Sequence, residues 1–457
     1  MKVAQIEDIL KEKIGSSKVK TSQEYLLSYS FDATGIKNLP SIVTFPECDS
    51  DISDILKTAT QYKIPVTPRG GGVGYSGGSV PVEGGIVIVF TKMNRIIEFN
   101  KDNLLLVAEP GVLTSEVINK CEENGFFYPP DPASLKNSTI GGNVAENAGG
   151  PRCFKYGVTS DYILSLEGFL MNGQKVEFGS HSIKDVSGYD IKKLIAGSEG
   201  TLIVLSRITL RMIPAPEKRI LVRCAFDSIR TAADFIKKII LLNLSPAVLE
   251  FMDKTSVEAV YEYIGAEKSG DVNAIVLLEF DGNTEEVGNK RKRLEEIISD
   301  SGISNIRFAE NNMETEELWS IRRNLSPAIS SIKPKKINED ISVPLGKVAD
   351  TIEYISSLGD KHDLKIVMFG HLGDGNIHTN IMIDPGDKRE VRESEIVLEK
   401  IFKYVISING TLTGEHGIGL AKKNYLNLQY SSEEIELFRK IKEVFDPDNL
   451  LNPGKIF

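Results

Sequence analysis

The chain has 457 residues, of which 41 % are hydrophobic and 26 % are charged, and its formal net charge is −10. This length exceeds what a single hydrophobic core usually supports, so we expect two domains. The acidic balance excludes nucleic acid as the main partner, because phosphate backbones are bound by basic surfaces. A local basic site for an anionic substrate remains compatible with this balance.

The first part of the chain predicts an α+β domain. Residues 1–15 form a charged, amphipathic helix pattern, and helical spacing of apolar residues recurs over 50–62 and 114–123. From Pro40 to Ile213, short apolar runs such as GGIVIVF and NLLLVAEPG alternate with glycine-rich turns. Many short strands without a regular strand–helix alternation are typical of an α+β fold rather than a doubly wound sheet.

A domain boundary is expected at Pro214 and Pro216, because the alternation of short apolar runs with glycine-rich turns ends there. Beyond it, the strand-like runs RILVRCAF, AVLEFMD and NAIVLLEFD alternate with helical patterns. This order predicts a ferredoxin-like antiparallel sheet covered by helices on one face. The expected domains are therefore 1–213 and 214–457.

The sequence contains neither a membrane-span pattern nor a metal-cluster pattern. No uncharged apolar stretch reaches about 18 residues, and the first residues lack the apolar core of a signal peptide. We expect a cytoplasmic protein, with peripheral membrane attachment left open. The cysteines are scattered and form no CxxC pair, which supports neither a zinc ribbon nor an iron–sulfur cluster: Cys48, Cys121, Cys153 and Cys224.

A first glycine loop spans 67–79 and reads TPRGGGVGYSGGS, in which Gly72, Gly74 and Gly77 match GxGxxG. In a dinucleotide fingerprint this motif follows a strand and opens a helix, whereas here it runs into another strand pattern. Successive glycines nevertheless let backbone N–H groups turn inward around an anion, and Arg69 adds a positive charge. The loop alone is equally typical of a surface turn.

Two further loops of small residues shift the interpretation. Residues 139–150 read TIGGNVAENAGG, and 196–202 read AGSEGTL. Three separated loops in one domain favour an elongated ligand whose diphosphate passes several backbones, because a mononucleotide would need only one.

Three of the five histidines lie in two glycine-rich contexts, FGHLGDGNIHTNI and TGEHGIG. The first context predicts a β-hairpin, with the turn at 373–376, that brings His371 and His378 side by side on neighbouring strands. Asn380 would lie on the face of His378, because side chains alternate along a strand. Two imidazoles at cross-strand distance are half of a metal site.

The second context supplies Glu415 and His416 between Gly414 and Gly417. Flanking glycines allow a bend in which both side chains line one cavity. Two histidines and one carboxylate are a common ligand set for zinc, iron or manganese. His416 is then left for proton transfer, while His181 and His362 are expected to be structural.

The glycine loops also carry a family resemblance. In order, PRGGGVGYSGG, PPDPASLKNSTIGGNVAENAGG, KYGVTSDYIL and AGSEGTL resemble the FAD-binding domain of the vanillyl-alcohol oxidase and p-cresol methylhydroxylase (PCMH) superfamily. The resemblance implies a two-subdomain PCMH-type FAD-binding domain. Many members attach FAD through a histidine of the first loop, where this chain has Val73, and no histidine precedes His181. We therefore expect FAD to be bound non-covalently.

The cofactor-binding residues that the resemblance implies come from the glycine loops, the KYG and SEGT segments and the C-terminal tail. They are Arg69, Gly70, Gly71, Gly72, Val73, Gly74, Gly77, Gly78, Pro130, Ser134, Thr139, Gly141, Gly142, Ala145, Asn147, Gly149, Gly150, Tyr156, Gly157, Glu199, Gly200 and Asn452.

GHLGDGNIH, GEHGIG and the terminal DPDNLLNPGKIF resemble the C-terminal domain of the FAD-linked oxidases. That group includes D-lactate dehydrogenases, glycolate oxidase D-type subunits, D-2-hydroxyglutarate dehydrogenases and alkyl-dihydroxyacetone-phosphate synthases. The resemblance implies that His371, His378 and Glu415 bind a divalent metal, that His416 is the base, and that the tail 445–457 returns to the flavin. Zinc is the first expectation, with manganese or iron as alternatives.

A hydroxy-acid substrate also needs a cation for its carboxylate, and arginine suits a bidentate grip. The segment ELWSIRRNLSPAIS resembles the family's substrate-arginine segment, which makes Arg322 the first candidate and Arg323 the reserve. Lys336 is a weaker candidate, and Asn338 or Glu339 occupies the place of the family's basic residue. Asn380 is the second expected substrate contact.

The resemblance implies a dehydrogenase that converts a D-2-hydroxy acid into the 2-keto acid, with D-lactate ahead of glycolate and D-2-hydroxyglutarate. Arg322 would hold the carboxylate, the metal would bind the 2-hydroxyl, and His416 would remove its proton as the C2 hydride passes to flavin N5. Electrons would leave to an external acceptor: oxygen, a quinone, a soluble carrier or a separate iron–sulfur subunit. A homodimer is left open.

Three alternatives remain at this stage. Within flavin chemistry, a synthase that exchanges an acyl for an alkyl group would need a long apolar channel. A zinc hydrolase would use the same His371, His378 and Glu415 with His416 activating water, but it gives no role to the glycine loops. A non-catalytic flavin-binding subunit would keep the cofactor without needing His416.

Overall fold

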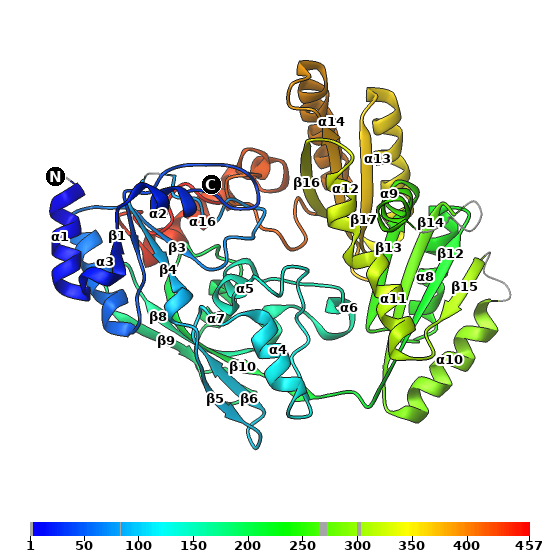
Figure 1. Cartoon of the computed structure of the whole chain (residues 1–457), viewed down its shortest axis with the longest axis horizontal. Coiled ribbons are helices and arrows are strands. Elements are labelled where there is room, and N and C mark those ends of the chain that lie inside the picture. Colours follow the sequence, from blue (N-terminus) through cyan, green and yellow to red (C-terminus); the bar gives the residue numbers. More distant parts are fainter. Residues whose placement is uncertain (1–2, 83, 266–271, 299–302) are drawn as a thin grey trace. The chain divides into compact units, whose positions relative to one another are not determined.

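The computed structural model describes residues 3–82, 84–265, 272–298 and 303–457 (Figure 1). The chain divides into two compact units. Unit 1 comprises Met1–Gly149, Val158–Ala215 and Glu415–Phe457, and unit 2 comprises Gly150–Gly157 and Pro216–Gly414. The two units therefore differ from the contiguous ranges 1–213 and 214–457, because residues 150–157 belong to unit 2 and residues 415–457 belong to unit 1.

Unit 1 contains two main β-sheets. One has the order β1-β2-β4-β3, in which β2, β4 and β3 run parallel, and the other is antiparallel with the order β5-β6-β10-β8-β9. A short antiparallel pair joins β7 to β11. The strands are β1 (Val19–Lys20), β2 (Ile42–Thr44), β3 (Val66–Arg69), β4 (Ile86–Val89), β5 (Ile96–Asn100), β6 (Leu105–Ala108), β7 (Phe126–Phe127), β8 (Ile163–Phe169), β9 (Lys175–Gly179), β10 (Val204–Arg211) and β11 (Ile213–Pro214).

The helices of unit 1 bury apolar stripes against these sheets. Ile6 and Leu10 of one helix pack with Ile55 of another and with Val66 and Ile86 of the parallel strands. The helical spacing read from the sequence is therefore confirmed, although residues 1 and 2 lie outside the described residues. The helices are α1 (Val3–Ile14), α2 (Gln23–Ser28), α3 (Asp49–Gln61), α4 (Thr114–Glu122), α5 (Ile140–Glu146), α7 (Ile191–Ile195), α15 (Leu426–Gln429) and α16 (Ser432–Phe445).

Unit 2 is built on one seven-stranded antiparallel sheet with the order β15-β12-β14-β13-β17-β18-β16 (Figure 1). The expected antiparallel sheet is confirmed. Its strands are β12 (Lys218–Phe226), β13 (Val248–Asp253), β14 (Ala274–Gly282), β15 (Ile303–Phe308), β16 (Lys335–Ser342), β17 (Lys365–His371) and β18 (Asn376–Ile383). Its helices are α6 (Cys153–Tyr156), α8 (Ile229–Leu241), α9 (Lys254–Ile264), α10 (Thr284–Ile298), α11 (Asn312–Arg323), α12 (Leu325–Ser330), α13 (Val348–His362) and α14 (Lys388–Ser407).

Helices pack on both faces of this sheet. On one face, Met252 and Phe369 share a core with residues of α9, α11 and α12. On the other, the ring of Phe226 lies 5.4 Å from the ring of Phe235 in α8, and α8 packs beside α13, which packs beside α14. The expectation that helices cover one face only is wrong, because strands such as β13 and β14 bury side chains on both sides.

The segment 150–157 lies in unit 2 although its sequence neighbours lie in unit 1. The guanidinium of Arg152 donates to Glu279 at 3.0 Å, and the hydroxyl of Tyr156 donates to Asp281 at 2.7 Å. Lys155 pairs with the same Asp281 carboxylate. Both acidic side chains are buried, so they hold the segment by charges that need partners away from water.

The C-terminal tail of unit 1 is fixed by a buried ammonium group. Lys442 of α16 donates at 2.7 Å to the carbonyl oxygens of Thr201 and Leu451, and at 2.5 Å to Asp446. Asp446 also accepts the backbone N–H of Leu451 at 2.7 Å. The side chains of Lys442 and Asp446 are 7 % and 0 % exposed. One ion pair therefore ties the tail to the helix before it.

We expect Lys442→Ala to lower the free energy of unfolding by about 3–5 kcal/mol, because removing one partner leaves the other charge buried and unpaired. Urea denaturation measures the loss. The matched control is Lys440→Ala, an exposed residue of the same helix, which should change stability by less than about 0.5 kcal/mol. Equal stability of the two variants would contradict this account of the tail.

Candidate functional site

A cavity in unit 1 is lined largely by backbone and small side chains. The glycine loop after β3 supplies one wall, the loop and helix at 132–149 supply another, and the segment around Glu199 supplies a third. Glu415 and His416 also line it. The three loops of small residues, which are far apart in the sequence, thus share one hollow.

The first glycine loop has unused hydrogen-bond donors. Within the part of the chain that the structure describes, the backbone N–H groups of residues 71–74 make no hydrogen bond. Consecutive free N–H groups at a cavity wall form a binding site for an anion. The second loop differs, because the N–H groups of Gly141 and Gly142 already donate to Pro110 and Thr139. It contributes shape rather than donors at these positions.

Several glycines face open space in this cavity. A Cβ atom added at Gly74, Gly142 or Gly200 would meet nothing nearer than 3.4 Å. Side chains there would occupy the hollow rather than collide with its walls. By contrast, a Cβ at Gly70 would come within 2.4 Å of the Thr139 hydroxyl, and one at Gly71 within 2.1 Å of the Asn137 carbonyl oxygen. The glycines therefore serve two purposes, close packing of the loops and room for a ligand. Such a hollow with free N–H groups fits the diphosphate of a dinucleotide.

Most of the predicted cofactor residues line this cavity. They are Arg69, Gly70, Gly71, Gly72, Val73, Gly74, Gly78, Ser134, Thr139, Gly141, Gly142, Ala145, Gly149, Glu199 and Gly200. The guanidinium of Arg69 is nevertheless turned to the protein, because it donates to the carbonyl of Phe31 at 2.7 Å and to Ser79 at 3.3 Å.

The other predicted cofactor residues lie off the cavity wall and have contacts of their own. Gly77 packs against Leu420, Asn147 accepts the N–H of Ser160 at the end of α5, and Asn452 donates to the carbonyls of Gly78 and Glu199. Pro130 is buried in unit 1, and Gly150, Tyr156 and Gly157 belong to unit 2.

The cavity also contains side chains that the sequence interpretation did not select, among them Asp32, Tyr75 and Glu146. Tyr75 and Glu146 lie inside the two glycine loops, so their position in the motifs was the available signal. Asp32 lies outside every motif, and nothing in the sequence marks it.

Glu199 connects three parts of unit 1. Its carboxylate accepts the N–H of Ile418 at 2.8 Å, and its carbonyl accepts the side-chain amide of Asn452 at 2.8 Å. Its own N–H donates to Ala145 at 2.7 Å, and its φ of 53° is a left-handed conformation. Burial raises the pKa of Glu199 to about 7, against the lowering effect of the Ile418 and Gly419 N–H groups.

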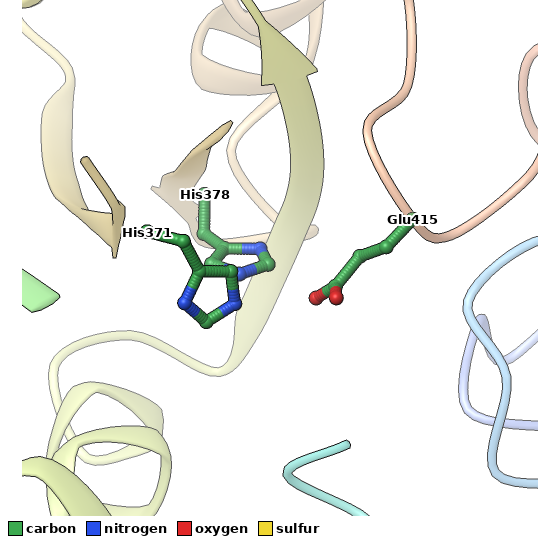
Figure 2. Close-up of side chains that lie close together, drawn as sticks. All are labelled: His371, His378 and Glu415. Carbon is green, nitrogen blue, oxygen red and sulfur yellow. The ribbon is translucent and has the colours of Figure 1, made fainter. Parts of the chain in front are cut away.

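The predicted hairpin is present in unit 2. β17 and β18 are antiparallel neighbours in which His371 is opposite Asn376 and His378 is opposite Phe369. The two histidine rings lie 5.3 Å apart, edge to face (Figure 2). Each histidine is 6 % exposed.

Glu415 directly follows Gly414, the last residue of unit 2. Gly414 is held there, because its N–H donates to Asp340 at 2.9 Å and Thr413 donates to the same carboxylate at 2.9 Å. His371, His378 and Glu415 each offer a ligand atom, and these atoms lie within 4.8 Å of one another (Figure 2). Two imidazoles and a carboxylate fit zinc, manganese or iron.

His416 follows in the chain and lines the cavity of unit 1. Its ring lies 5.2 Å from the ring of Tyr75, and its Nε2 is 3.9 Å from a carboxylate oxygen of Glu415. A Cβ at Gly417, whose φ is +86°, would come within 2.5 Å of Glu146. Glycine is therefore required where the chain bends after the histidine.

The structure separates the two candidate arginines. Arg322 is largely buried, donates through Nε to Glu250 at 2.5 Å and lies over the ring of Phe369. In the described chain its two terminal nitrogens make no hydrogen bond, so they can grip a carboxylate. Arg323 is exposed and pairs with Glu316. Burial raises the pKa of Glu250, but His371 and Arg322 outweigh this effect and keep it below its usual range.

The remaining substrate candidates lie on two faces of the sheet. Asn380 and Asn338 are opposite each other on β18 and β16, on the face that carries His378. Asn380 is fully buried and donates to the carbonyl of Val367 at 3.2 Å. Lys336 lies on the same face, whereas Glu339 is on the other.

Comparison with protein families accounts for both units. The FAD binding domain family matches residues 40–179, and the family of FAD linked oxidases, C-terminal domain, matches residues 215–456. The chain belongs to the FAD linked oxidases. It is accordingly an FAD-dependent oxidoreductase.

Relatives of this FAD linked oxidase cover almost its whole length. Glycolate oxidase subunit GlcD of Bacillus subtilis (strain 168) is 38 % identical over 94 % of this chain and 92 % of its own. D-lactate dehydrogenase of Anaerostipes hadrus is 32 % identical over 97 % of this chain and 96 % of its own. Among solved structures, p-cresol methylhydroxylase with substrate bound shares the fold, with a TM-score of 0.84, 14 % identity and coverage of 99 % and 96 %.

None of the described helices of this FAD linked oxidase combines the length and the apolar character needed to span a lipid bilayer.

We expect Gly142→Leu to lower the FAD content of the purified protein, because the new side chain would extend into the open space in front of this glycine. The ratio of flavin absorbance to protein absorbance measures it. The matched control is Gly288→Leu on α10, an exposed position where an added Cβ meets nothing within 4 Å. Undiminished FAD in the Gly142 variant would place the cofactor elsewhere.

We expect Glu199→Gln to change how stability depends on pH. The raised pKa means that wild-type stability falls as pH rises from about 4.5 through about 7, since the folded state resists ionisation of this carboxyl. Relative to the glutamine variant, the wild type should lose up to about 3 kcal/mol across this window. Urea denaturation at a series of pH values measures the difference. The exposed control Glu443→Gln should run parallel to the wild type, and a parallel Glu199→Gln curve would contradict the raised pKa.

Proposed function

We propose that this FAD linked oxidase oxidises a small D-2-hydroxy acid to the 2-keto acid, with D-lactate ahead of glycolate and D-2-hydroxyglutarate. The observation that carries the proposal is the group formed by His371, His378 and Glu415, whose ligand atoms lie within 4.8 Å of one another. The residue after Glu415 is His416, which lines the glycine cavity. The relatives named for glycolate and D-lactate support the substrate class.

Oxidation of a 2-hydroxy acid removes a proton from the hydroxyl group and a hydride from C2. FAD, bound non-covalently in the glycine cavity, supplies the acceptor for the hydride. A divalent ion on His371, His378 and Glu415 supplies positive charge that makes a nearby hydroxyl more acidic. Zinc is the first candidate, and manganese or iron are alternatives.

The chain's own residues do the rest of the work. The free terminal nitrogens of Arg322 orient the substrate by its carboxylate, because a guanidinium fork matches two carboxylate oxygens. Asn380 adds a polar contact on the same face. His416 accepts the hydroxyl proton, because a neutral imidazole has a ring nitrogen that can act as a general base.

An external acceptor would be needed to take up the electrons that FAD would receive. The spacing of the four cysteines offers no iron–sulfur cluster for onward electron transfer. Oxygen, a quinone, a soluble carrier or a separate iron–sulfur subunit would take this role. The GlcD relative is itself named a subunit, which favours a partner protein.

The test is anaerobic mixing of the purified, metal-loaded protein with D-lactate, glycolate or D-2-hydroxyglutarate while the visible flavin absorbance is followed. At least one acid should bleach the flavin, and L-lactate should not. His416→Ala should retain FAD but slow the bleaching by roughly 10²- to 10⁴-fold, whereas the exposed His181→Ala should not. If dithionite bleaches the flavin and none of the D-acids does, the substrate class is wrong. An unchanged rate of flavin bleaching in His416→Ala would show that His416 is not the base.

A further inference from the structure

One buried carboxylate in unit 2 contacts both a metal-ligand candidate and the substrate arginine. Glu250 lies in the middle of β13 and is fully buried among apolar neighbours. It is opposite His371 in the sheet, and its carboxylate meets Nδ1 of that ring. The other carboxylate oxygen accepts the Nε–H of Arg322 at 2.5 Å.

A side chain in this position is costly unless it is paired. An ionised carboxylate inside a protein needs hydrogen bonds and opposite charge to offset the loss of water. Neither of its partners is a surface group, since the Arg322 side chain is 12 % exposed and that of His371 is 7 % exposed. Replacing such a buried charged group together with its partners by apolar residues of similar volume is often neutral or stabilising. A role in aligning the two partners explains why a charge is kept there.

The contact decides which atom of His371 can bind a metal. With Nδ1 donating its proton to Glu250, Nε2 is left as the ring nitrogen with a lone pair, on the far side of the ring. A carboxylate behind a ligand histidine fixes its tautomer and ring orientation and strengthens it as a ligand. Figure 2 shows this ring beside that of His378.

The same carboxylate decides which atoms of Arg322 are offered to a ligand. Its Nε is occupied by Glu250, and its guanidinium carbon lies 4.8 Å from the centre of the Phe369 ring, so the two terminal nitrogens are the ones offered to a ligand. Arg322 and His371 are thereby both held by the same carboxylate of β13. A hydroxyl near the metal and a carboxylate at the arginine would then be held at a fixed separation.

We propose that Glu250 is a positioning residue that aligns His371 for metal binding and Arg322 for the carboxylate of a 2-hydroxy acid. This inference rests on the proposed function for the identity of the two ligands. It concerns the chain's own residues and can be measured without turnover.

The test compares Glu250→Gln with Asp253→Asn in the flavin-containing protein. Asp253 is a buried carboxylate of the same strand, but it caps α9 by accepting the Ser256 N–H at 2.8 Å and the Met368 N–H at 3.0 Å. It therefore reports the cost of neutralising a buried carboxylate in β13 without touching His371 or Arg322. After removal of bound metal with a chelator, zinc and manganese affinities are measured by calorimetry, together with FAD content and urea denaturation.

We expect Glu250→Gln to weaken metal binding by about 10- to 100-fold with FAD content unchanged. The KM of the hydroxy acid should also rise in this variant. Asp253→Asn should lose stability with wild-type metal affinity. Isotope-labelled histidine gives a second readout, because with only five histidines in the chain the ring nitrogens of His371 can be followed. They should show the Nδ1-protonated form in the wild type and a changed tautomer balance in Glu250→Gln.

Three results would overturn the inference. They are unchanged metal affinity in Glu250→Gln, an equal loss of metal affinity in Asp253→Asn, and absence of metal binding by the wild type. Failure of the proposed function looks different. No hydroxy acid would then reduce the flavin, while metal affinity would still depend on Glu250.

Discussion

The segment from Thr413 to Ile418 is held at both ends by buried carboxylates, and the candidate chemistry lies between these anchors. Asp340 of unit 2 accepts the N–H of Gly414, and Glu199 of unit 1 accepts the N–H of Ile418. Glu415 and His416 thus lie between two backbone positions, each of which is held by a carboxylate of its own unit. Neighbouring residues can then have different tasks, one as a metal ligand and the other as a base.

Buried acidic side chains recur wherever this chain needs a fixed geometry. Glu250 holds two side chains, Asp446 holds the tail, and Glu279 and Asp281 hold the segment 150–157. Such groups are unfavourable away from water unless fully partnered. They resist small displacements, since any shift leaves a charge without its partner. The glycine loops are positioned by the opposite means, because the absence of side chains lets their backbones pack closely against neighbouring segments.

Much of this organisation was predictable from the sequence. Alternation along β18 put His378 and Asn380 on one face, and the turn at 373–376 paired His371 with its neighbour strand. Glycine spacing located the cavity walls, although it could not tell Gly74, which faces open space, from Gly71, which packs against the second loop. That distinction depends on contacts between distant segments.

Other features had no local signature. Glu250 is one acidic residue in an apolar run, which shows that a partner is needed but not which one. The apolar residues of β13 and β14 were consistent with either one or two covered faces, and only the packed helices decide between them. Glu199 was selected for its motif, but its link to the backbone of Ile418 joins residues that are more than two hundred positions apart and follows from tertiary structure alone.

The interrupted layout of the two units affects how the chain is made. Unit 1 needs the segment 415–457, which is synthesised after the main segment of unit 2, to complete a core in which Leu450 and Leu451 pack with residues of α1 and α3. Domains that are continuous in sequence can fold on the ribosome as they emerge, whereas unit 1 stays incomplete until the residues after Gly414 have been made. Unit 2, whose main segment ends at Gly414, has all of its residues available earlier. Synthesis of unit 1 therefore begins before that of unit 2, but the residues of unit 1 are complete only after those of unit 2.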